Sequence, residues 1–274
     1  MGTPDLFQTS TTSRIRVGIG GWTYAPWRNN FYPPRLAQRR ELEHASRQVT
    51  SIEVNGTYYG AQKPATYAKW RAETPDGFVF SLKAPRYVTE RARLADAGGA
   101  IDAFVRGGLA ELGDRLGPIN WQFAKGRPFE RDDFAAFLDR LPAELDGMPL
   151  RHVVEVRDAS FLCEPFLDLA RAHRVATVFT DSSEYPSFAD LTGDFVYARL
   201  MGSRADVETG YAPAALDAWA QRARMWADGG DPPDLPHVSM PNPSGKPLEV
   251  FVYFISAAKE RNPAAARALI DRLR

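Results

Sequence analysis

Residues 152–181 read HVVEVRDASFLCEPFLDLARAHRVATVFTD, and the pattern in this stretch decides the fold. It opens with a β-branched run, His152 to Arg157, and continues through a segment of helical periodicity, Pro165 to His173. It closes with a second β-rich run, Thr177 to Asp181. A strand, a helix and a strand in succession predict two parallel strands joined by a crossover helix.

The same alternation extends over the rest of the chain in both directions. The expected strands are Ile15 to Gly20, Thr50 to Asn55, Phe78 to Lys83, Ile119 to Phe123, His152 to Arg157, Thr177 to Asp181, Phe195 to Leu200 and Val250 to Phe254. The expected helices are Leu36 to Arg47, Pro64 to Glu73, Gly99 to Leu116, Asp132 to Leu141, Pro165 to His173, Pro213 to Ala227 and Pro263 to Leu273. Between Ser182 and Asp194 there is room for only a turn or two, so we expect the sixth helix to be short or absent. Eight such repeats favour a (β/α)8 TIM-type barrel, whose usual length is roughly 250 residues.

The alternative architecture is a doubly wound open sheet, which is marked by a phosphate-binding glycine loop after its first strand. Gly18-Ile19-Gly20-Gly21 begins such a loop, but Thr23 stands where the third glycine is required. We therefore expect one barrel over residues 14–274. Residues 1–13 are polar and aperiodic, and we expect them to form a disordered tail.

The composition is that of an ordinary globular chain, with 44% hydrophobic and 25% charged residues. Lys and Arg number 34 and so do Asp and Glu, so no global field attracts nucleic acid or an anionic membrane surface. No apolar run approaches the roughly 20 residues that cross a bilayer. The start of the chain lacks a basic segment and an apolar h-region, and Cys163 is its single cysteine, so we expect a cytoplasmic protein.

Polar residues end six of the eight expected strands. Side chains alternate between the two faces of a strand, so Ile52 and Val54 facing the helices turn Glu53 and Asn55 toward the barrel interior. By the same alternation the inward positions at the ends of the next five strands are Lys83, Gln122, Glu155 with Arg157, Asp181 and Arg199. All of these groups are expected at the C-terminal end of the barrel.

Two interpretations of this polar ring are open. Burying an unpaired charge costs several kcal/mol, so the ring must either pair internally or bind a ligand. In the first case Glu155 pairs with Arg157 and Glu53 with Lys83, and the ring only caps the core. The second case is favoured because the active sites of barrels lie at this face.

The loops that follow the strands add aromatic and basic residues to the same face. The first loop carries five aromatic residues, of which Trp22 and Tyr24 are our candidate ligand contacts. Such rings either stack on a sugar or base ring of a ligand or pack against the barrel rim. Arg86, Arg91 and Arg93 follow the third strand, although a run of this kind is usually a solvated surface.

Several kinds of site are disfavoured. The four histidines fall away from the expected pocket, which argues against a histidine-rich zinc site and against serine–histidine chemistry. A glycosidase needs two carboxyl groups flanking one bond, but the fourth and seventh strands end in Gln122 and Arg199. No cofactor is predicted, although Glu53, Glu155 and Asp181 offer oxygen ligands suited to Mg²⁺ or Mn²⁺.

The sequence resembles the YecE-like family, known as domain of unknown function 72, over about residues 15–273. The resemblance rests on GIGGWTY at 18–24, IEVNGTYY at 52–59, FVFSLK at 78–83 and VEVR at 154–157, in this order. It implies a TIM-type barrel and no established activity. It also implies a pocket built on Trp22, Glu53, Asn55, Lys83, Gln122, Glu155, Arg157 and Asp181.

The sequence also departs from the family pattern. Glu90, Asp158 and Met201 stand where the family commonly has histidine, and FISA at 254–257 replaces an asparagine-rich strand end. Histidine is the usual group for proton transfer near neutral pH, so its loss removes candidate acids and bases. A divergent or inactive member of the family fits this pattern.

We expect an enzyme that acts on a small anionic or polyhydroxylated ligand. Lys83, Arg157 and Arg199 would bind the anion, while Glu53 and Glu155 would transfer protons. A lysine near two guanidinium groups is also a candidate nucleophile. The alternative is a non-catalytic barrel that binds a sugar, a nucleotide or a nucleic-acid end, and a third possibility is a scaffold whose ring only stabilises the fold.

Overall fold

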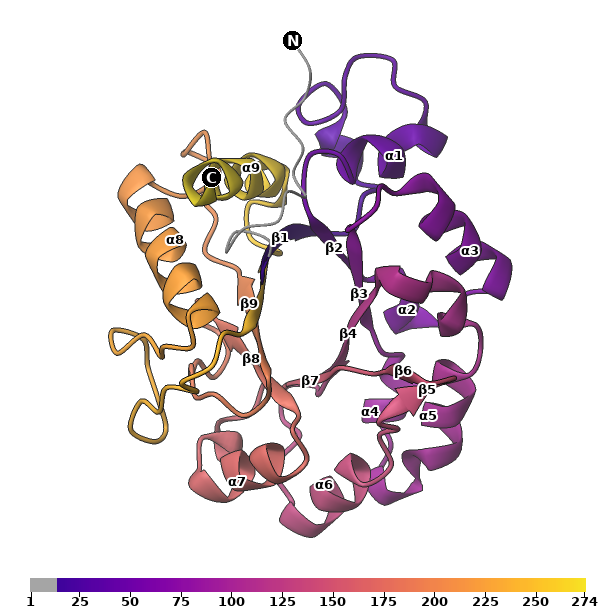
Figure 1. Ribbon diagram of the computed structural model, residues 1–274, viewed down its shortest axis with the longest axis vertical. Helices are drawn as coiled ribbons and strands as arrows, with labels where there is room; N and C mark the ends of the chain where they lie inside the picture. The colour runs from indigo at the N-terminus through magenta and orange to yellow at the C-terminus, as the bar shows by residue number, and fades with distance from the viewer. Residues whose placement is uncertain (1–13) are drawn as a thin grey trace.

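In the computed structural model, which describes residues 14–274, eight parallel strands close into a barrel inside a layer of helices (Figure 1). The strands of the barrel are β1 (Ile15–Gly20), β2 (Ser51–Val54), β3 (Val79–Lys83), β4 (Leu116–Gln122), β7 (His152–Glu155), β8 (Ala176–Thr180), β9 (Phe195–Leu200) and β10 (Glu249–Phe254). Strand β10 pairs with β1 and closes the barrel, with Val252 opposite Val17. The predicted TIM-type barrel is confirmed, while the tail predicted for residues 1–13 lies outside the described residues.

The outer layer consists of helices that follow the strands. They are α1 (Glu41–Ala45), α2 (Gly56–Tyr59), α3 (Pro64–Glu73), α4 (Arg86–Thr89), α5 (Gly98–Val105), α6 (Arg131–Leu138), α7 (Glu164–Ala172), α8 (Pro213–Ala227) and α9 (Asn262–Leu273). Short 3-10 segments occur at Ala25–Trp27, Gln38–Arg40, Leu94–Ala97, Leu109–Arg115, Ala159–Phe161 and Lys259–Arg261. Helices α3 and α8 begin at prolines, as predicted, because proline lacks only an N–H that the first turn leaves unpaired. No helix lies between β8 and β9, as also predicted.

Two predicted helices are shorter than expected. The segment 36–47 contains only a 3-10 turn and α1, and the segment 99–116 is interrupted after α5. At this interruption Gly108 has a φ of 126°, and a Cβ there would lie 2.9 Å from the Cα of Pro64. Only glycine fits such a close approach of two backbones, so the helix ends. A hairpin of β5 (Glu144–Leu145) and β6 (Met148–Pro149) was not predicted.

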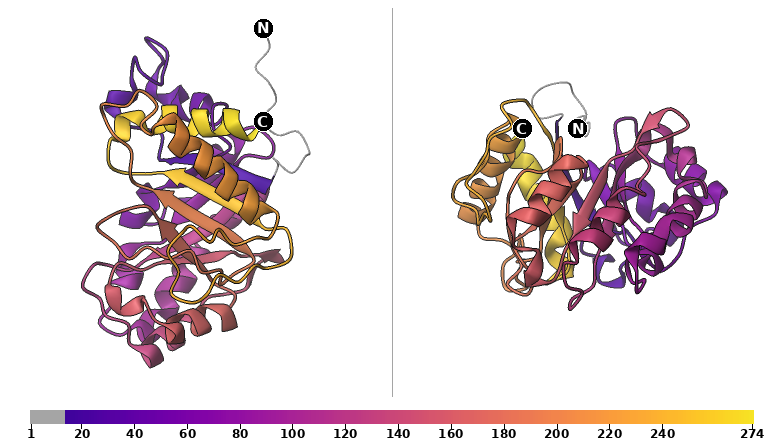
Figure 2. Two further views of the ribbon diagram at one scale, coloured as in Figure 1. Left: turned by 90° about the vertical axis from the view of Figure 1, so that its left-hand side faces the viewer. Right: turned by 90° about the horizontal axis from the view of Figure 1, so that it is seen from below.

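The interior of the barrel changes character along its axis. Its lower part is filled by apolar and aromatic side chains, including Phe195, Tyr197, Phe251 and Tyr253. Figure 2 shows the strands of this wall running beneath the outer helices, and α8 and α9 pack against β10 and β1. At the C-terminal ends of the strands the inward side chains become charged. None of the helices in residues 14–274 has the length and apolar character needed to cross a membrane.

Candidate functional site

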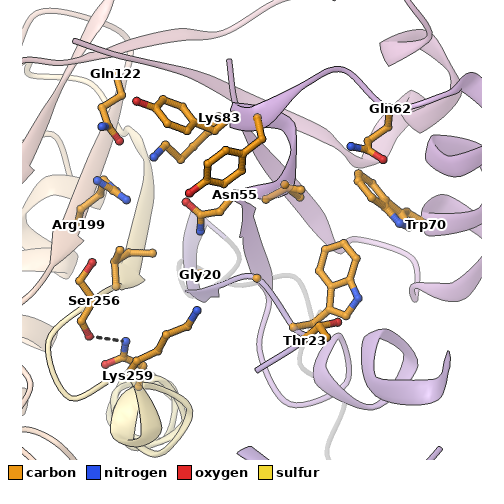
Figure 3. A pocket seen from close by; sticks show the side chains of 18 of the residues that line it. Gly20, Thr23, Asn55, Gln62, Trp70, Lys83, Gln122, Arg199, Ser256 and Lys259 are labelled. Carbon is orange, nitrogen blue, oxygen red and sulfur yellow. Dashed lines mark hydrogen bonds between the residues drawn. The ribbon is translucent and has the colours of Figure 1, made fainter. Parts of the chain in front are cut away.

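A cavity of about 720 Å³ opens at the C-terminal ends of the strands (Figure 3). Its walls come from the ends of β3, β4 and β9 and from the loops after β1, β2, β7 and β10. The polar and aromatic residues that line it are Trp22, Thr23, Asn55, Tyr58, Tyr59, Gln62, Trp70, Lys83, Gln122, Arg157, Arg199, Ser256, Lys259 and Asn262. The size is within the range of roughly 300–1,000 Å³ that small-molecule sites occupy.

A closed ion-pair cluster forms the floor of the cavity. Arg199 donates from Nη1 to Oε2 of Glu155 at 2.6 Å and from Nη2 to Oε1 of Glu53 at 3.0 Å. The hydroxyl of Tyr197 donates to the other oxygen of Glu53 at 2.7 Å. All three charged groups are buried, and neither glutamate is part of the cavity wall. The two carboxylates therefore hold Arg199 in place.

The charges in this cluster keep Glu155 and Arg199 ionised. Burial alone raises the pKa of Glu155, but the charges of Arg199, Arg157 and Lys83 outweigh it and bring the pKa to about 2. Burial alone lowers the pKa of Arg199, and the carboxylates of Glu155 and Glu53 reverse the shift and raise it. Glu155 is thus a fixed anion over the physiological pH range, which makes it unsuited to proton transfer near neutral pH.

Lys83 differs from the cluster beneath it. The residue is only 7% exposed, and within the described part of the chain its ammonium makes neither an ion pair nor a hydrogen bond. Its Nζ lies 4.1 Å from the centre of the Tyr58 ring, a cation–π contact. Burial, and next the charge of Arg199, lower the pKa of Lys83 to about 8. A buried cation therefore faces the cavity without a counter-charge of its own.

Two further cations line the cavity. Arg157 donates from Nε to Oε1 of Glu155 at 2.8 Å, and its guanidinium lies over the ring of Tyr185. Lys259 lies over the ring of Tyr24, and burial lowers its pKa. Within residues 14–274, the cavity and its floor thus combine four cations with two carboxylates. The site has an excess of two positive charges when Lys83 and Lys259 are protonated.

The opposite side of the cavity is aromatic. The rings of Trp22 and Trp70 meet edge to face with centroids 5.1 Å apart, and both residues are partly exposed. Tyr67 and Phe80, which are fully buried, support Trp70 from below. On the cationic side, the buried Oε1 of Gln122 and Nε of Arg199 have no hydrogen-bond partner among the described residues. Buried polar atoms without a hydrogen-bond partner are uncommon in folded proteins.

The structure places most of the predicted site residues together. Those that line the cavity are Trp22, Asn55, Lys83, Gln122, Arg157 and Arg199. Glu53 and Glu155 face the interior, as the alternation predicted, but they lie beneath the cavity rather than on its wall. Of the two ion pairs predicted for a self-paired ring, one is present, because Glu155 pairs with Arg157. The other is absent, because Glu53 pairs with Arg199 and not with Lys83.

Two predicted contacts lie elsewhere. Val178 belongs to the interior cluster, so the alternation along β8 puts Asp181 on the outer side, contrary to our prediction. Asp181 accepts hydrogen bonds from the backbone N–H of Met201 and from the hydroxyl of Tyr211. Tyr24 packs edge to face on Trp27 and lies outside the cavity wall.

The oxygen ligands that we considered for a divalent ion do not converge. Glu53 and Glu155 pair with Arg199, whereas Asp181 accepts a hydrogen bond from the backbone N–H of Met201. Among the described residues there is no group of three or more His, Cys, Asp or Glu side chains that could hold a metal ion.

Some lining residues were missed by the sequence analysis. Tyr58 lies on α2 and Lys259 lies beyond β10, whereas only strand ends and the first and third loops were considered. A structural sign of this region is backbone strain, because Ser256 and Ala257 have φ values of 58° and 46°. Consecutive non-glycine residues in this left-handed region are uncommon and concentrate at functional sites. Nothing in the sequence indicated these φ values.

Comparisons with known proteins agree with this architecture. The family model described as "Protein of unknown function DUF72" matches residues 16–274. UPF0759 protein YunF of Bacillus subtilis is 30% identical over 79 residues, which cover 29% of this chain and 27% of that relative.

Two solved structures of DUF72 family proteins show the same fold. The protein from Enterococcus faecalis V583 has a TM-score of 0.68 at 16% identity, over 94% of this chain and 95% of that chain. The protein from Thermotoga maritima MSB8 has a TM-score of 0.66 at 19% identity, over 94% of this chain and 97% of that one. The match with the family model, over most of the chain, is what identifies the family.

Proposed function

This chain belongs to the DUF72 family, and from that premise and the geometry of the cavity we propose that it is an enzyme that binds a small anionic molecule and uses Lys83 in the reaction. The observation that carries the proposal is the Lys83 ammonium, which is buried at the cavity without a carboxylate partner in the described part of the chain. An unpaired buried charge costs several kcal/mol. A bound anion would supply the missing counter-charge.

The roles that we propose for the charged residues differ from those that we expected from the sequence. Glu53 and Glu155 are positioning residues in this proposal, because their oxygens are held by Arg199. Lys83 and Arg157, which line the cavity, contact the anionic group of the ligand. Lys83 also supplies the chemistry, because a pKa of about 8 leaves an appreciable fraction of neutral amine near neutral pH. A neutral lysine is a base and a nucleophile.

Anion binding is tested by thermal unfolding in phosphate, sulfate and acetate at constant ionic strength. We expect at least one of these anions to raise the Tm of the parent protein, because a ligand at 100 times its Kd stabilises the folded state by about 2.7 kcal/mol. Lys83→Met should abolish the rise. The matched control is Lys246→Met, which removes an exposed lysine outside the cavity and should keep it. Equal responses of the parent and Lys83→Met would contradict the proposal.

The reactivity of Lys83 is tested separately by labelling with acetic anhydride and peptide mapping. We expect the rate at Lys83 to rise with a midpoint near pH 8, below the usual lysine pKa of about 10.4. Phosphate should slow the labelling of Lys83 and leave that of Lys246 unchanged. If Lys83 titrates like an exposed lysine while anions still stabilise the protein, the cavity is a binding site without this chemistry.

A further inference from the structure

The two sides of the cavity have different chemistry and face each other across it. In Figure 3, Lys83, Gln122 and Arg199 lie together on one side, while Trp70, Thr23 and Gln62 lie on the other. The first group carries the excess positive charge. The second group combines apolar ring surface with hydroxyl and amide groups.

The two indoles of the aromatic side pack against each other and against buried rings. Trp22 lies edge to face against Trp70 and contacts Phe80 with centroids 6.2 Å apart, and Phe80 is fully buried. Trp70 in turn meets the buried ring of Tyr67 at 5.3 Å. Contacts on several sides fix the two indoles, so a ligand that stacks on them loses little affinity to ordering of the protein. Both indoles keep part of their surface at the cavity.

The cavity is much larger than a simple anion. Its volume is about 720 Å³, whereas one water molecule occupies roughly 30 Å³ of the liquid. A phosphate or carboxylate held at Lys83 would leave most of the space beside Trp22 and Trp70 to solvent. Apolar ring surface next to unfilled space is where a second part of a ligand gains free energy by burial.

We propose that the ligand is an anion that carries a ring, with its phosphate or carboxylate at Lys83 and Arg157 and its ring against Trp22 and Trp70. The chemical class is that of sugar phosphates and of phosphates or carboxylates of planar rings. Thr23 and Gln62 supply polar contacts around the ring. This inference rests on the proposed function, because the anionic group is placed by Lys83.

The inference is tested by calorimetric titration with inorganic phosphate, glucose 6-phosphate and phenyl phosphate. We expect at least one of the ring-bearing probes to bind the parent protein ten or more times tighter than phosphate. A gain for glucose 6-phosphate alone assigns a sugar ring, and a gain for phenyl phosphate alone assigns a planar ring. If neither probe binds tighter than phosphate, the inference is overturned.

Variants test whether the gain in affinity for the ring-bearing probe comes from the aromatic side of the cavity. Trp22→Leu should bring the ring-bearing probe to the affinity of phosphate without weakening phosphate itself, and Trp22→Phe should keep most of the gain. The matched control is Tyr87→Leu, an exposed aromatic residue outside the cavity wall, which should behave as the parent. A gain that survives in Trp22→Leu and in Trp70→Leu, both shown to be folded by urea denaturation, overturns the inference. Failure of phosphate itself to bind, or unchanged phosphate binding in Lys83→Met, instead overturns the proposed function.

Discussion

Buried charges occur at both ends of the barrel, but they differ in whether hydrogen-bond partners satisfy them. At the N-terminal end, Asp190 accepts the backbone N–H groups of Val238 and Ser239 at 2.7 and 2.9 Å. Asp231 accepts from His237 and from the N–H of Asn242. Both oxygens of each carboxylate have a donor, whereas Lys83 at the C-terminal end has no polar partner among residues 14–274.

The difference indicates that the carboxylates stabilise the fold, whereas Lys83 is suited to bind a ligand. Asp190 attaches the segment 228–248 to the loop between β8 and β9, Asp231 links two parts of that segment to each other, and the hydrogen bonds of both carboxylates offset the cost of burial. Arg199 is intermediate, because Glu53 and Glu155 pair with two of its nitrogens while its Nε has no partner among residues 14–274. The attraction of Glu155 and Glu53 offsets only part of the cost of burying Lys83. Variants of these residues should therefore change stability in different directions.

The largest effect is expected for Arg199→Met, which leaves Glu53 and Glu155 buried without their shared partner. Removing one member of a buried ion pair costs about 3 to 5 kcal/mol, and here two carboxylates lose it. Urea denaturation at pH 7 should therefore show a loss of stability of at least this size. Adding Glu53→Gln and Glu155→Gln to the same chain should recover a large part of it. A loss below about 1 kcal/mol would show that the cluster is not a closed structural unit.

At the N-terminal end, Asp190→Ala should lower the free energy of unfolding by about 2 to 4 kcal/mol, because two backbone N–H groups lose their acceptor. The matched control, Asp194→Ala, removes an exposed carboxylate from the same loop and should change stability by less than about 0.5 kcal/mol. Anion-induced stabilisation should persist in both variants. Its loss in Asp190→Ala would mean that the two ends of the barrel are coupled.

Lys83→Met should have the opposite sign. Without ligand at pH 7 we expect it to raise the free energy of unfolding by about 1 to 3 kcal/mol, because the cost of burying the charge exceeds the cation–π contact with Tyr58 that is lost. Urea denaturation measures this change. A loss of about 3 to 5 kcal/mol would instead show that Lys83 completes the ion pairs of Glu53 or Glu155.

The difference in stability between the parent and Lys83→Met should depend on pH. The folded protein releases the Lys83 proton at about pH 8, and the unfolded chain keeps it to the usual pKa of about 10.5. Between these values the unfolded state binds more protons, so this group makes the parent more stable as pH rises. The advantage of Lys83→Met should therefore be largest below pH 8 and vanish above about 10.5. A constant difference across this range would mean that the charge of Lys83 is not its source.

The smallest effect is expected at His237, with the reverse dependence. Burial lowers its pKa, but the hydrogen bonds with Asp231 and with the carbonyl of Leu235, together with the charges of Asp231 and Asp190, outweigh burial and raise the pKa above the usual value of about 6.5. Its stabilising contribution is therefore complete below pH 6.5 and is lost as pH rises through the raised pKa. Parallel urea denaturation of the parent and His237→Gln should show a pH-dependent difference within about 1 kcal/mol. The absence of any pH dependence would show that His237 is not charged in the folded state.

Much of this protein was predictable from the sequence because the deciding signals are local. The eight strands and the inward positions of Glu53, Lys83, Glu155 and Arg199 follow from alternation within short runs, which each run specifies by itself. The prediction for Asp181 was wrong by one position, since β8 turns Val178 rather than its neighbours inward. A shift of one residue moves a side chain to the other face of a strand.

Only the tertiary structure decided which charges pair. Glu53 and Arg199 are 146 residues apart, and they meet because closure of the barrel makes the ends of β2 and β9 face one narrow interior. Once Arg199 takes both carboxylates, Lys83 is left over the Tyr58 ring with no anion of its own. The sequence determined that these groups share one end of the barrel. Their partners depend on distances across the barrel, which no short stretch of sequence encodes.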